Sequence, residues 1–177
     1  MLFNINKEEV LAATRQVKML LLDVDGVLTD GKLYFSNSGE ELKAFSTLDG
    51  HGIKMLQKAG IEVGIITGRK SALLERRALD LGIGLLIQGR EDKDVALAEI
   101  LAERDITSEQ IAYAGDDFPD LPVLKTVGVS FSVPAGHADV KSAVAAITEA
   151  AGGAGAVREI TDFILHSQNL YSQFLPE

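Results

Sequence analysis

Five short apolar segments alternate with longer stretches of helical periodicity along most of the sequence. Each is rich in Leu, Ile or Val and is bounded by Gly, Asp, Thr or Pro: MLLLDV (19–24), IEVGIIT (61–67), GLLIQ (84–88), IAYAGD (111–116) and VGVSFSV (127–133). Strands that are apolar on both faces belong inside a parallel sheet covered by helices on its two sides. The sequence therefore predicts an α/β fold with a doubly wound, Rossmann-like parallel sheet.

The stretches between these segments have apolar residues three and four positions apart, as on one face of a helix. They are residues 52–60, 70–82, 92–104, 119–126 and 138–147. A further helix is predicted at residues 7–15, where Asn6 and Glu9 have the spacing of a capping box. A chain of 177 residues, of which 46% are apolar, can bury one sizeable core, so we expect a single domain over residues 1–177.

One segment, residues 31–46, interrupts the alternation directly after the first strand. It reads as two short strands joined by the turn NSGE (37–40) and so predicts an inserted β-hairpin. A hairpin alone in water is marginally stable, so this one must pack on something. The apolar side chains it offers are Leu33, Phe35, Leu42 and Phe45. A symmetric oligomer would cover this face and the unpaired strand edges.

Charge and cysteine content exclude several classes of function. The 26 acidic and 17 basic residues give a net charge of −9, which repels polyanions, so neither nucleic acid nor membrane is expected as a partner. The absence of cysteine excludes disulfides, thiolate ligands and cysteine nucleophiles. The first ten residues carry acids and amides where a signal peptide would be apolar, so we expect a cytoplasmic protein.

Polar and charged side chains follow the ends of successive predicted strands. Asp23 and Asp25 follow the first strand, Thr67, Gly68 and Arg69 the second and Asp116 the fourth, while Lys93 begins the helix after the third. Carboxyl ends of parallel strands meet at one sheet edge, so these side chains should lie together. Each alone has a plain alternative as a cap, a turn former or a solvated lysine. Together, residues of these types favour a phosphoryl-transfer site.

The chemistry follows from these residue types. Hard oxygen ligands without His or Cys select Mg²⁺, and Asp23 and Asp116 are the predicted ligands. Once Mg²⁺ and Lys93 neutralise the repulsion between Asp23 and an incoming phosphate, the Asp23 carboxylate can attack phosphorus and form an aspartyl-phosphate. Asp25, two residues on, can protonate the leaving oxygen and then activate water. Thr67 and backbone amides after Asp23 would hold the phosphoryl oxygens.

Four motifs, in order, resemble those of the haloacid dehalogenase superfamily of phosphohydrolases. They are DVDGVLTD (23–30), ITGR (66–69), the lysine of EDKDVALAEI (91–100) and GDDFPD (115–120). The resemblance implies Asp23 as nucleophile, Asp25 as acid/base with its backbone carbonyl also on Mg²⁺, Thr67 and Lys93 as phosphate ligands, and Asp116 as metal ligand. The roles of Asp117 and Asp120 stay open. The gaps between the motifs leave no room for the cap domain of many members.

Two further segments, residues 29–53 and GGAGAVREITDFIL (152–165), resemble a narrower group of capless phosphatases. This group forms homotetramers through its hairpins and acts on an eight-carbon keto-sugar-acid phosphate in lipopolysaccharide precursor synthesis. The resemblance implies a glycine-hinged C-terminal tail, residues 151–177, that can fold over a neighbour's active site. Composition alone would make the glycines a flexible linker.

An acidic sugar phosphate needs cations at both of its ends. Arg69 beside Gly68, Lys93, and Arg158 from a neighbouring subunit would supply them. His51 is expected near the entrance, with a solvated loop histidine as the alternative.

Two other functions remain as alternatives. Phosphatases of nine-carbon keto-acid phosphates share the first of these segments, and the tail is what favours the eight-carbon substrate. A phospho-acceptor receiver domain also has acids after the first strand, with a Thr and a Lys near the site. Its acceptor Asp, however, ends the third strand, where GLLIQGRE has no Asp.

Overall fold

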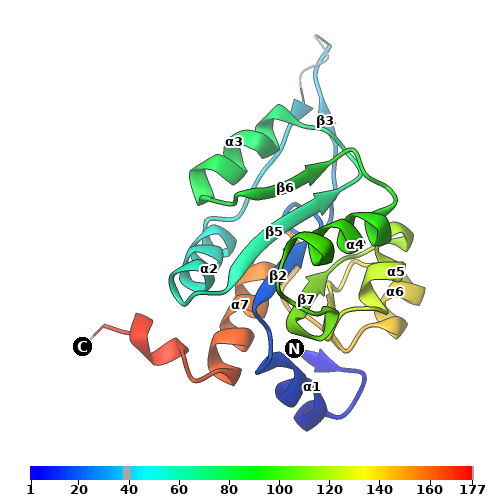
Figure 1. Cartoon of the computed structure of the whole chain (residues 1–177). Helices are drawn as coiled ribbons and strands as arrows, with labels where there is room; N and C mark the ends of the chain where they lie inside the picture. The colour runs from blue at the N-terminus through cyan, green and yellow to red at the C-terminus, as the bar shows by residue number, and fades with distance from the viewer. Residues whose placement is uncertain (38–40, 177) are drawn as a thin grey trace.

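The computed structural model describes residues 1–37 and 41–176. Within these residues seven strands form one sheet: β1 (Leu2–Phe3), β2 (Met19–Leu22), β5 (Glu62–Thr67), β6 (Leu85–Gln88), β7 (Ile111–Ala114), β8 (Val129–Ser132) and β9 (Ala146–Ile147). Their order is β1-β9-β8-β7-β2-β5-β6, and Figure 1 labels the neighbouring strands β7, β2, β5 and β6. Every neighbouring pair is parallel except β1 and β9, which are antiparallel. The predicted α/β fold is confirmed.

Helices cover both faces of this sheet. One face carries α1 (Lys7–Thr14), α2 (Thr47–Lys58), α3 (Ala72–Leu81) and α7 (Ala156–Ser167); the other carries α4 (Lys93–Glu103), α5 (Leu121–Leu124) and α6 (Ala138–Ala143). Short 3₁₀ helices lie at Ser108–Gln110, Phe118–Asp120 and Tyr171–Phe174. Strand β2 serves both cores, with Leu20 and Leu22 in the first and Met19 and Leu21 in the second. A strand buried on both faces needs a continuous apolar run.

The predicted elements and the structure differ at the last strand. The helix expected over residues 138–147 ends at Ala143, and Ala146–Ile147 form β9 between β8 and β1. Neither β1 nor β9 is predicted from the sequence, because a two-residue strand is too short to show a period.

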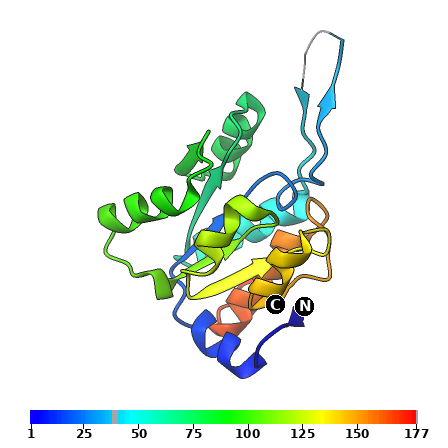
Figure 2. The same ribbon diagram turned by 90° about the vertical axis from the view of Figure 1, so that its right-hand side faces the viewer.

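The expected hairpin is present as β3 (Tyr34–Phe35) and β4 (Glu41–Leu42), which pair antiparallel. Figure 2 shows it, in light blue, extending away from the main sheet. Residues 38–40 of the expected turn NSGE lie outside the described residues. Phe35 and Leu42 are 65% and 67% exposed, whereas Phe45 packs against the first core.

Leu42 pairs with Tyr34, which is also exposed, so these two side chains share one face of the hairpin and Phe35 lies on the other. The expected single apolar face containing both Phe35 and Leu42 is therefore wrong. Both faces expose apolar side chains, which is typical of a segment that contacts a partner.

Helix α7, which lies within the expected glycine-hinged tail 151–177, packs into the core of this chain. It packs along α2, with Val157, Ile160 and Ile164 fully buried. A carboxylate oxygen of Asp49, in α2, accepts a hydrogen bond from the backbone N–H of Arg158 at 2.8 Å. An acceptor in this position satisfies one of the unpaired N–H groups in the first turn of α7.

The glycine-rich segment before α7 lies against the loop that follows β2. A Cβ atom on Gly152 would lie 1.7 Å from the backbone oxygen of Gly26. The N–H of Gly153 donates to the backbone oxygen of Val27 at 3.0 Å. Glycine is required at position 152 because any side chain would overlap that loop. In this conformation the segment is in contact with the loop that carries Asp25.

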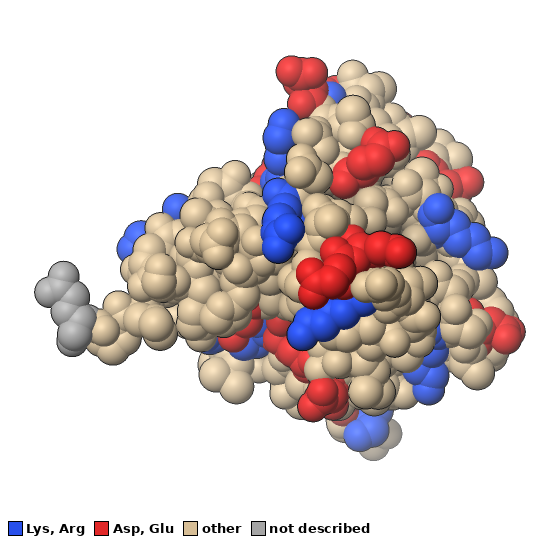
Figure 3. Space-filling view, turned by 90° about the horizontal axis from the view of Figure 1, so that it is seen from below, with Lys and Arg blue, Asp and Glu red and all other residues tan. Residues whose placement is uncertain are grey.

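The lower face of the molecule, seen in Figure 3, carries lysines and arginines interspersed with aspartates, glutamates and uncharged residues. Mixed charge gives no extended surface of one sign on this face. In the part of the chain that the structure describes, no helix is both long and apolar enough to pass through a membrane.

Candidate active site

A cavity of about 400 Å³ opens at the carboxyl ends of β2, β5 and β7. Seven predicted site residues line it: Asp23, Asp25, Thr67, Gly68, Arg69, Lys93 and Asp116. The chain continues from β2 toward β5 on one side and later returns to β7 on the other. Ligands of open α/β sheets bind where the strand order reverses in this way. The predicted cluster therefore exists, at the expected edge of the sheet.

Two predicted residues, Arg158 and His51, are not among the residues that line this cavity in the single chain. Nε of Arg158 donates to Oδ1 of Asp162, one turn further along α7, at 2.7 Å. His51 lines a separate hollow beside Lys54 and Arg77. The expected contribution of Arg158 from a neighbouring subunit, and a place for His51 at the entrance, stay predictions.

Thr67 and Arg69 both line the cavity, and Arg69 lies beside Asp25. Thr67 ends β5 and is 2% exposed, and its hydroxyl oxygen accepts from the backbone N–H of Arg69 at 3.4 Å. Nε of Arg69 lies 3.7 Å from Oδ2 of Asp25, and 44% of the Arg69 side chain is exposed. A threonine hydroxyl and a guanidinium are thus available to an anion entering the cavity.

Lys93 is buried between two carboxylates. Its Nζ donates to Oδ1 of Asp23 at 2.7 Å and to Oδ1 of Asp120 at 2.6 Å, and the residue is 4% exposed. Burial alone would lower the pKa of Lys93, but the charges of Asp23 and Asp120 outweigh it and raise the pKa above its usual value. Lys93 is therefore a fixed cation at the base of the site.

Asp120 accepts four hydrogen bonds, two at each carboxylate oxygen. Lys93 and the hydroxyl of Tyr113 donate to Oδ1, the latter at 2.6 Å. The backbone N–H groups of Asp116 and Asp117 donate to Oδ2 at 3.0 and 3.2 Å. All four acceptor positions of the carboxylate are used, so Asp120 orients Lys93 and the loop after β7. Sequence reasoning missed Tyr113, although a buried tyrosine implies a partner for its hydroxyl.

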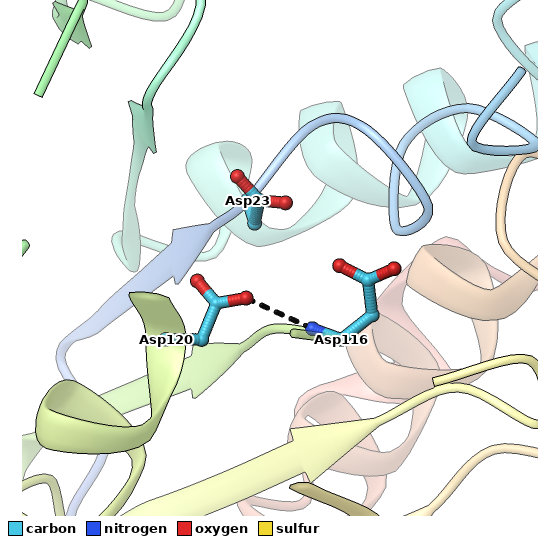
Figure 4. A group of neighbouring side chains, drawn as sticks. All are labelled: Asp23, Asp116 and Asp120. Atoms are coloured by element: carbon cyan, nitrogen blue, oxygen red, sulfur yellow. Dashed lines mark hydrogen bonds between the residues drawn. The ribbon is translucent and has the colours of Figure 1, made fainter. Parts of the chain in front are cut away.

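Figure 4 shows Asp23, Asp116 and Asp120 gathered around one space, and their nearest oxygens lie within 4.8 Å of one another. Burial raises the pKa of Asp23 from 3.8 to about 6 against the opposing charge of Lys93. Burial, and then the charge of Asp23, raise the pKa of Asp116 to about 7. A cation bound between these carboxylates would relieve the repulsion between their charges.

The donor set fits Mg²⁺, which prefers carboxylate oxygens. Because Asp120 is already saturated with hydrogen bonds, Asp23 and Asp116 are the candidate ligands. Gly26 makes room for Asp116, since a Cβ atom there would lie 2.0 Å from Oδ2 of Asp116. The glycine of the DVDG motif therefore has a steric role beside the candidate metal site.

We expect Mg²⁺ to stabilise the protein much more at about pH 8 than at about pH 5. Asp23 and Asp116 have raised pKa values in the folded state, so metal-free folded protein binds protons that the unfolded chain releases. Below about pH 4 these protons contribute fully to the unfolding free energy of the metal-free protein, and the contribution is lost as the pH rises through about 6 to 7. Mg²⁺ competes with these protons for Asp23 and Asp116, so it stabilises the protein more where the protons have been released. With the ion in ~100-fold excess over its Kd, the melting temperature should rise on the order of 5–10 °C at pH 8. Equal shifts at both pH values, measured by calorimetry, would contradict this reading.

Comparison with known proteins identifies the family. Residues 83–160 match the family of haloacid dehalogenase-like hydrolases. Over 160 residues the chain is 46% identical to the 3-deoxy-D-manno-octulosonate 8-phosphate phosphatase KdsC of Escherichia coli (strain K12), covering 90% of this chain and 85% of that protein. The chain belongs to the 3-deoxy-D-manno-octulosonate 8-phosphate phosphatase family. Both levels of resemblance predicted from the motifs are confirmed.

Solved structures of this phosphatase family have the same fold. The enzyme from Yersinia pestis is 45% identical with a TM-score of 0.92, over 93% of this chain and 89% of that one. The enzyme from Moraxella catarrhalis, in complex with magnesium, phosphate and KDO, is 40% identical with a TM-score of 0.94, over 96% and 97% of the two chains. The chain thus spans nearly the whole of the 3-deoxy-D-manno-octulosonate 8-phosphate phosphatase fold.

Proposed function

We propose that this protein is a Mg²⁺-dependent phosphatase that hydrolyses 3-deoxy-D-manno-octulosonate 8-phosphate to 3-deoxy-D-manno-octulosonate (KDO) and phosphate, in lipopolysaccharide precursor synthesis. One observation carries the proposal: Lys93 holds Asp23 beside Asp116 in a cavity of a chain 46% identical to such a phosphatase. The Moraxella catarrhalis enzyme was solved with magnesium and both products of this reaction. The sequence identity and the ligands of that enzyme support the same metal and substrate for this protein.

Asp23 and Asp116, with the backbone carbonyl of Asp25, would hold Mg²⁺. When bound, the ion supplies positive charge that makes an anionic phosphate tolerable beside the carboxylates. The remaining groups belong to the chain itself. Lys93 supplies a second positive charge, and Thr67 a hydroxyl donor, for the phosphoryl oxygens.

The covalent steps are assigned to two aspartates. Lys93 fixes Oδ1 of Asp23, and Asp23 attacks phosphorus while the bond from phosphorus to the sugar oxygen breaks. Asp25 protonates that oxygen as it leaves. Asp25 then takes a proton from the water that attacks the aspartyl-phosphate, which releases phosphate and restores Asp23. The position of Asp25 in the cavity lining, two residues after Asp23, supports both roles.

The rest of the substrate carries a carboxylate, which Arg69, next to Gly68, would bind. This role is supported by the position of Arg69 in the cavity lining and by its partial exposure. A neighbouring subunit would add Arg158, and His51 would lie near the entrance, in a cytoplasmic homotetramer. Supporting this assembly, the hairpin exposes Tyr34 and Leu42 on one of its faces and Phe35 on the other in the single chain. Such a surface is covered when subunits associate through it.

The deciding assay measures Mg²⁺-dependent phosphate release from eight-carbon and nine-carbon keto-acid phosphates and from an aryl phosphate. We expect kcat/KM for the eight-carbon substrate to exceed that for the nine-carbon one at least about 10-fold. Preference for the nine-carbon substrate would establish the alternative function. Equal values for all three would overturn the substrate assignment and leave a general phosphatase. Chelation of the metal should abolish release, and added Mg²⁺ should restore it.

A further inference from the structure

Lys43, directly after strand β4 of the hairpin, is buried beside Asp25. Its Nζ donates to Oδ1 of Asp25, and only 2% of the Lys43 side chain is exposed. Lysine is almost never this deeply buried unless its charge is paired. The contact links two segments 18 residues apart in the sequence. It therefore depends on how the hairpin leaves and rejoins the fold.

A second lysine of the same hairpin gives the contrast. Nζ of Lys32 lies 3.3 Å from Oδ2 of Asp30, and 70% of the Lys32 side chain is exposed. Exposed pairs of this kind contribute little to stability, because water competes for both charges. The Lys43 contact differs in its burial and in its partner, which is a residue of the candidate active site.

The position of Lys43 indicates what the contact does. Asp25 lines the cavity, whereas Lys43 is outside the set of residues that line it. Lys43 holds Oδ1 of Asp25, while Oδ2 lies toward Arg69, which is itself a cavity residue. A carboxylate held at one oxygen presents the other in a fixed direction. Placement of this kind matters because a reacting group displaced by about 1 Å can cost on the order of 100-fold in rate.

We propose that Lys43 is a positioning residue for Asp25, and that through it the hairpin orients the acid/base group. This inference rests on the proposed function, since it assumes that Asp25 transfers protons in both half-reactions. Lys43 contacts neither the phosphate nor the leaving group. Its loss leaves substrate binding nearly intact and slows the steps in which Asp25 takes part.

The two half-reactions respond differently when Asp25 is misplaced. The first, with a sugar alcohol as leaving group, needs a proton from Asp25. With p-nitrophenyl phosphate the leaving phenolate is stable, so this step depends little on Asp25. Hydrolysis of the aspartyl-phosphate needs Asp25 as a base with either substrate. A variant without Lys43 should therefore accumulate aspartyl-phosphate from the aryl substrate.

The test compares Lys43→Met with Lys32→Met, which makes the same change at the exposed lysine of the hairpin. For the eight-carbon substrate, Lys43→Met should lower kcat about 100-fold and change KM less than about 3-fold. Rapid mixing with p-nitrophenyl phosphate should give a burst near one nitrophenol per active site and then slow turnover. Lys32→Met should behave like the parent. A raised KM with unchanged kcat would indicate that Lys43 binds substrate. A lowered melting temperature with unchanged kinetics would indicate that Lys43 is structural. Either result overturns the proposal.

A double-variant cycle adds a second test. If Lys43 acts through Asp25, Lys43→Met added to Asp25→Asn should change kcat less than about 2-fold. An additive loss would overturn the proposal. The parent protein, assayed in parallel, separates the two levels of inference. A parent that releases no phosphate from any ester defeats the proposed function, whereas an active parent with Lys43→Met kinetics like those of Lys32→Met defeats the positioning role alone.

Discussion

Asp23→Asn should abolish phosphate release while the protein remains folded. The amide has nearly the same shape and keeps an oxygen for the hydrogen bond from Lys93, 2.7 Å in the parent, but it cannot attack phosphorus. Loss of a covalent nucleophile lowers kcat on the order of 10⁴-fold or more. Because Asp23 is buried with a pKa raised to about 6, the neutral amide also removes repulsion with Asp116. The melting temperature of the metal-free variant at about pH 8 should therefore not fall.

Asp30→Asn is the matched control in the same acid-rich segment. Asp30 accepts from the backbone N–H of Lys32 and the hydroxyl of Tyr34, outside the cavity lining. Its replacement should leave kcat unchanged. Acid-quenched parent protein should carry a phosphate adduct on the peptide containing Asp23, and Asp23→Asn should not. Phosphate release by Asp23→Asn above about 1% of the parent rate would rule out the nucleophile assignment.

The central strands and the acid-bearing sheet edge are predictable because they depend on local patterns. The runs that form β2 and β5 are apolar without interruption, and a parallel sheet brings their carboxyl ends together whatever the details of packing. Asp23, Thr67 and Asp116 follow from this geometry. The edge strands β1 and β9 do not, since two residues carry no period.

The hydrogen-bond network beneath the site is not predictable from local pattern. The motif GDDFPD leaves the role of Asp120 open, whereas in the structure Asp120 joins Lys93, Tyr113 and two backbone amides. A lysine such as Lys43 in a short inserted hairpin is expected to be solvated, and its burial depends on the path of the whole insert. Partners set by tertiary packing leave no periodic signal.

Lys93→Met should abolish turnover and also destabilise the metal-free protein. The substitution leaves two buried carboxylates, Asp23 and Asp120, without the cation between them. Removal of one partner from a buried ion pair costs about 3–5 kcal/mol of unfolding free energy. Without Lys93 the pKa of Asp23 should rise further, so the folded state gains affinity for protons. The deficit should therefore be small at about pH 5 and grow as the pH rises past about 7, as urea unfolding at both values would show.

A second substitution separates this electrostatic effect from the chemical one. Lys93→Met with Asp120→Asn removes one of the stranded charges, so it should recover part of the unfolding free energy at about pH 8 without recovering turnover. Lys125→Met, at an exposed position after α5, is the control for loss of a lysine and should alter neither quantity. If the double variant were as unstable as Lys93→Met, charge repulsion would not explain the loss. If Lys93→Met kept a kcat within about 10-fold of the parent, the buried lysine would be structural rather than part of the phosphate site.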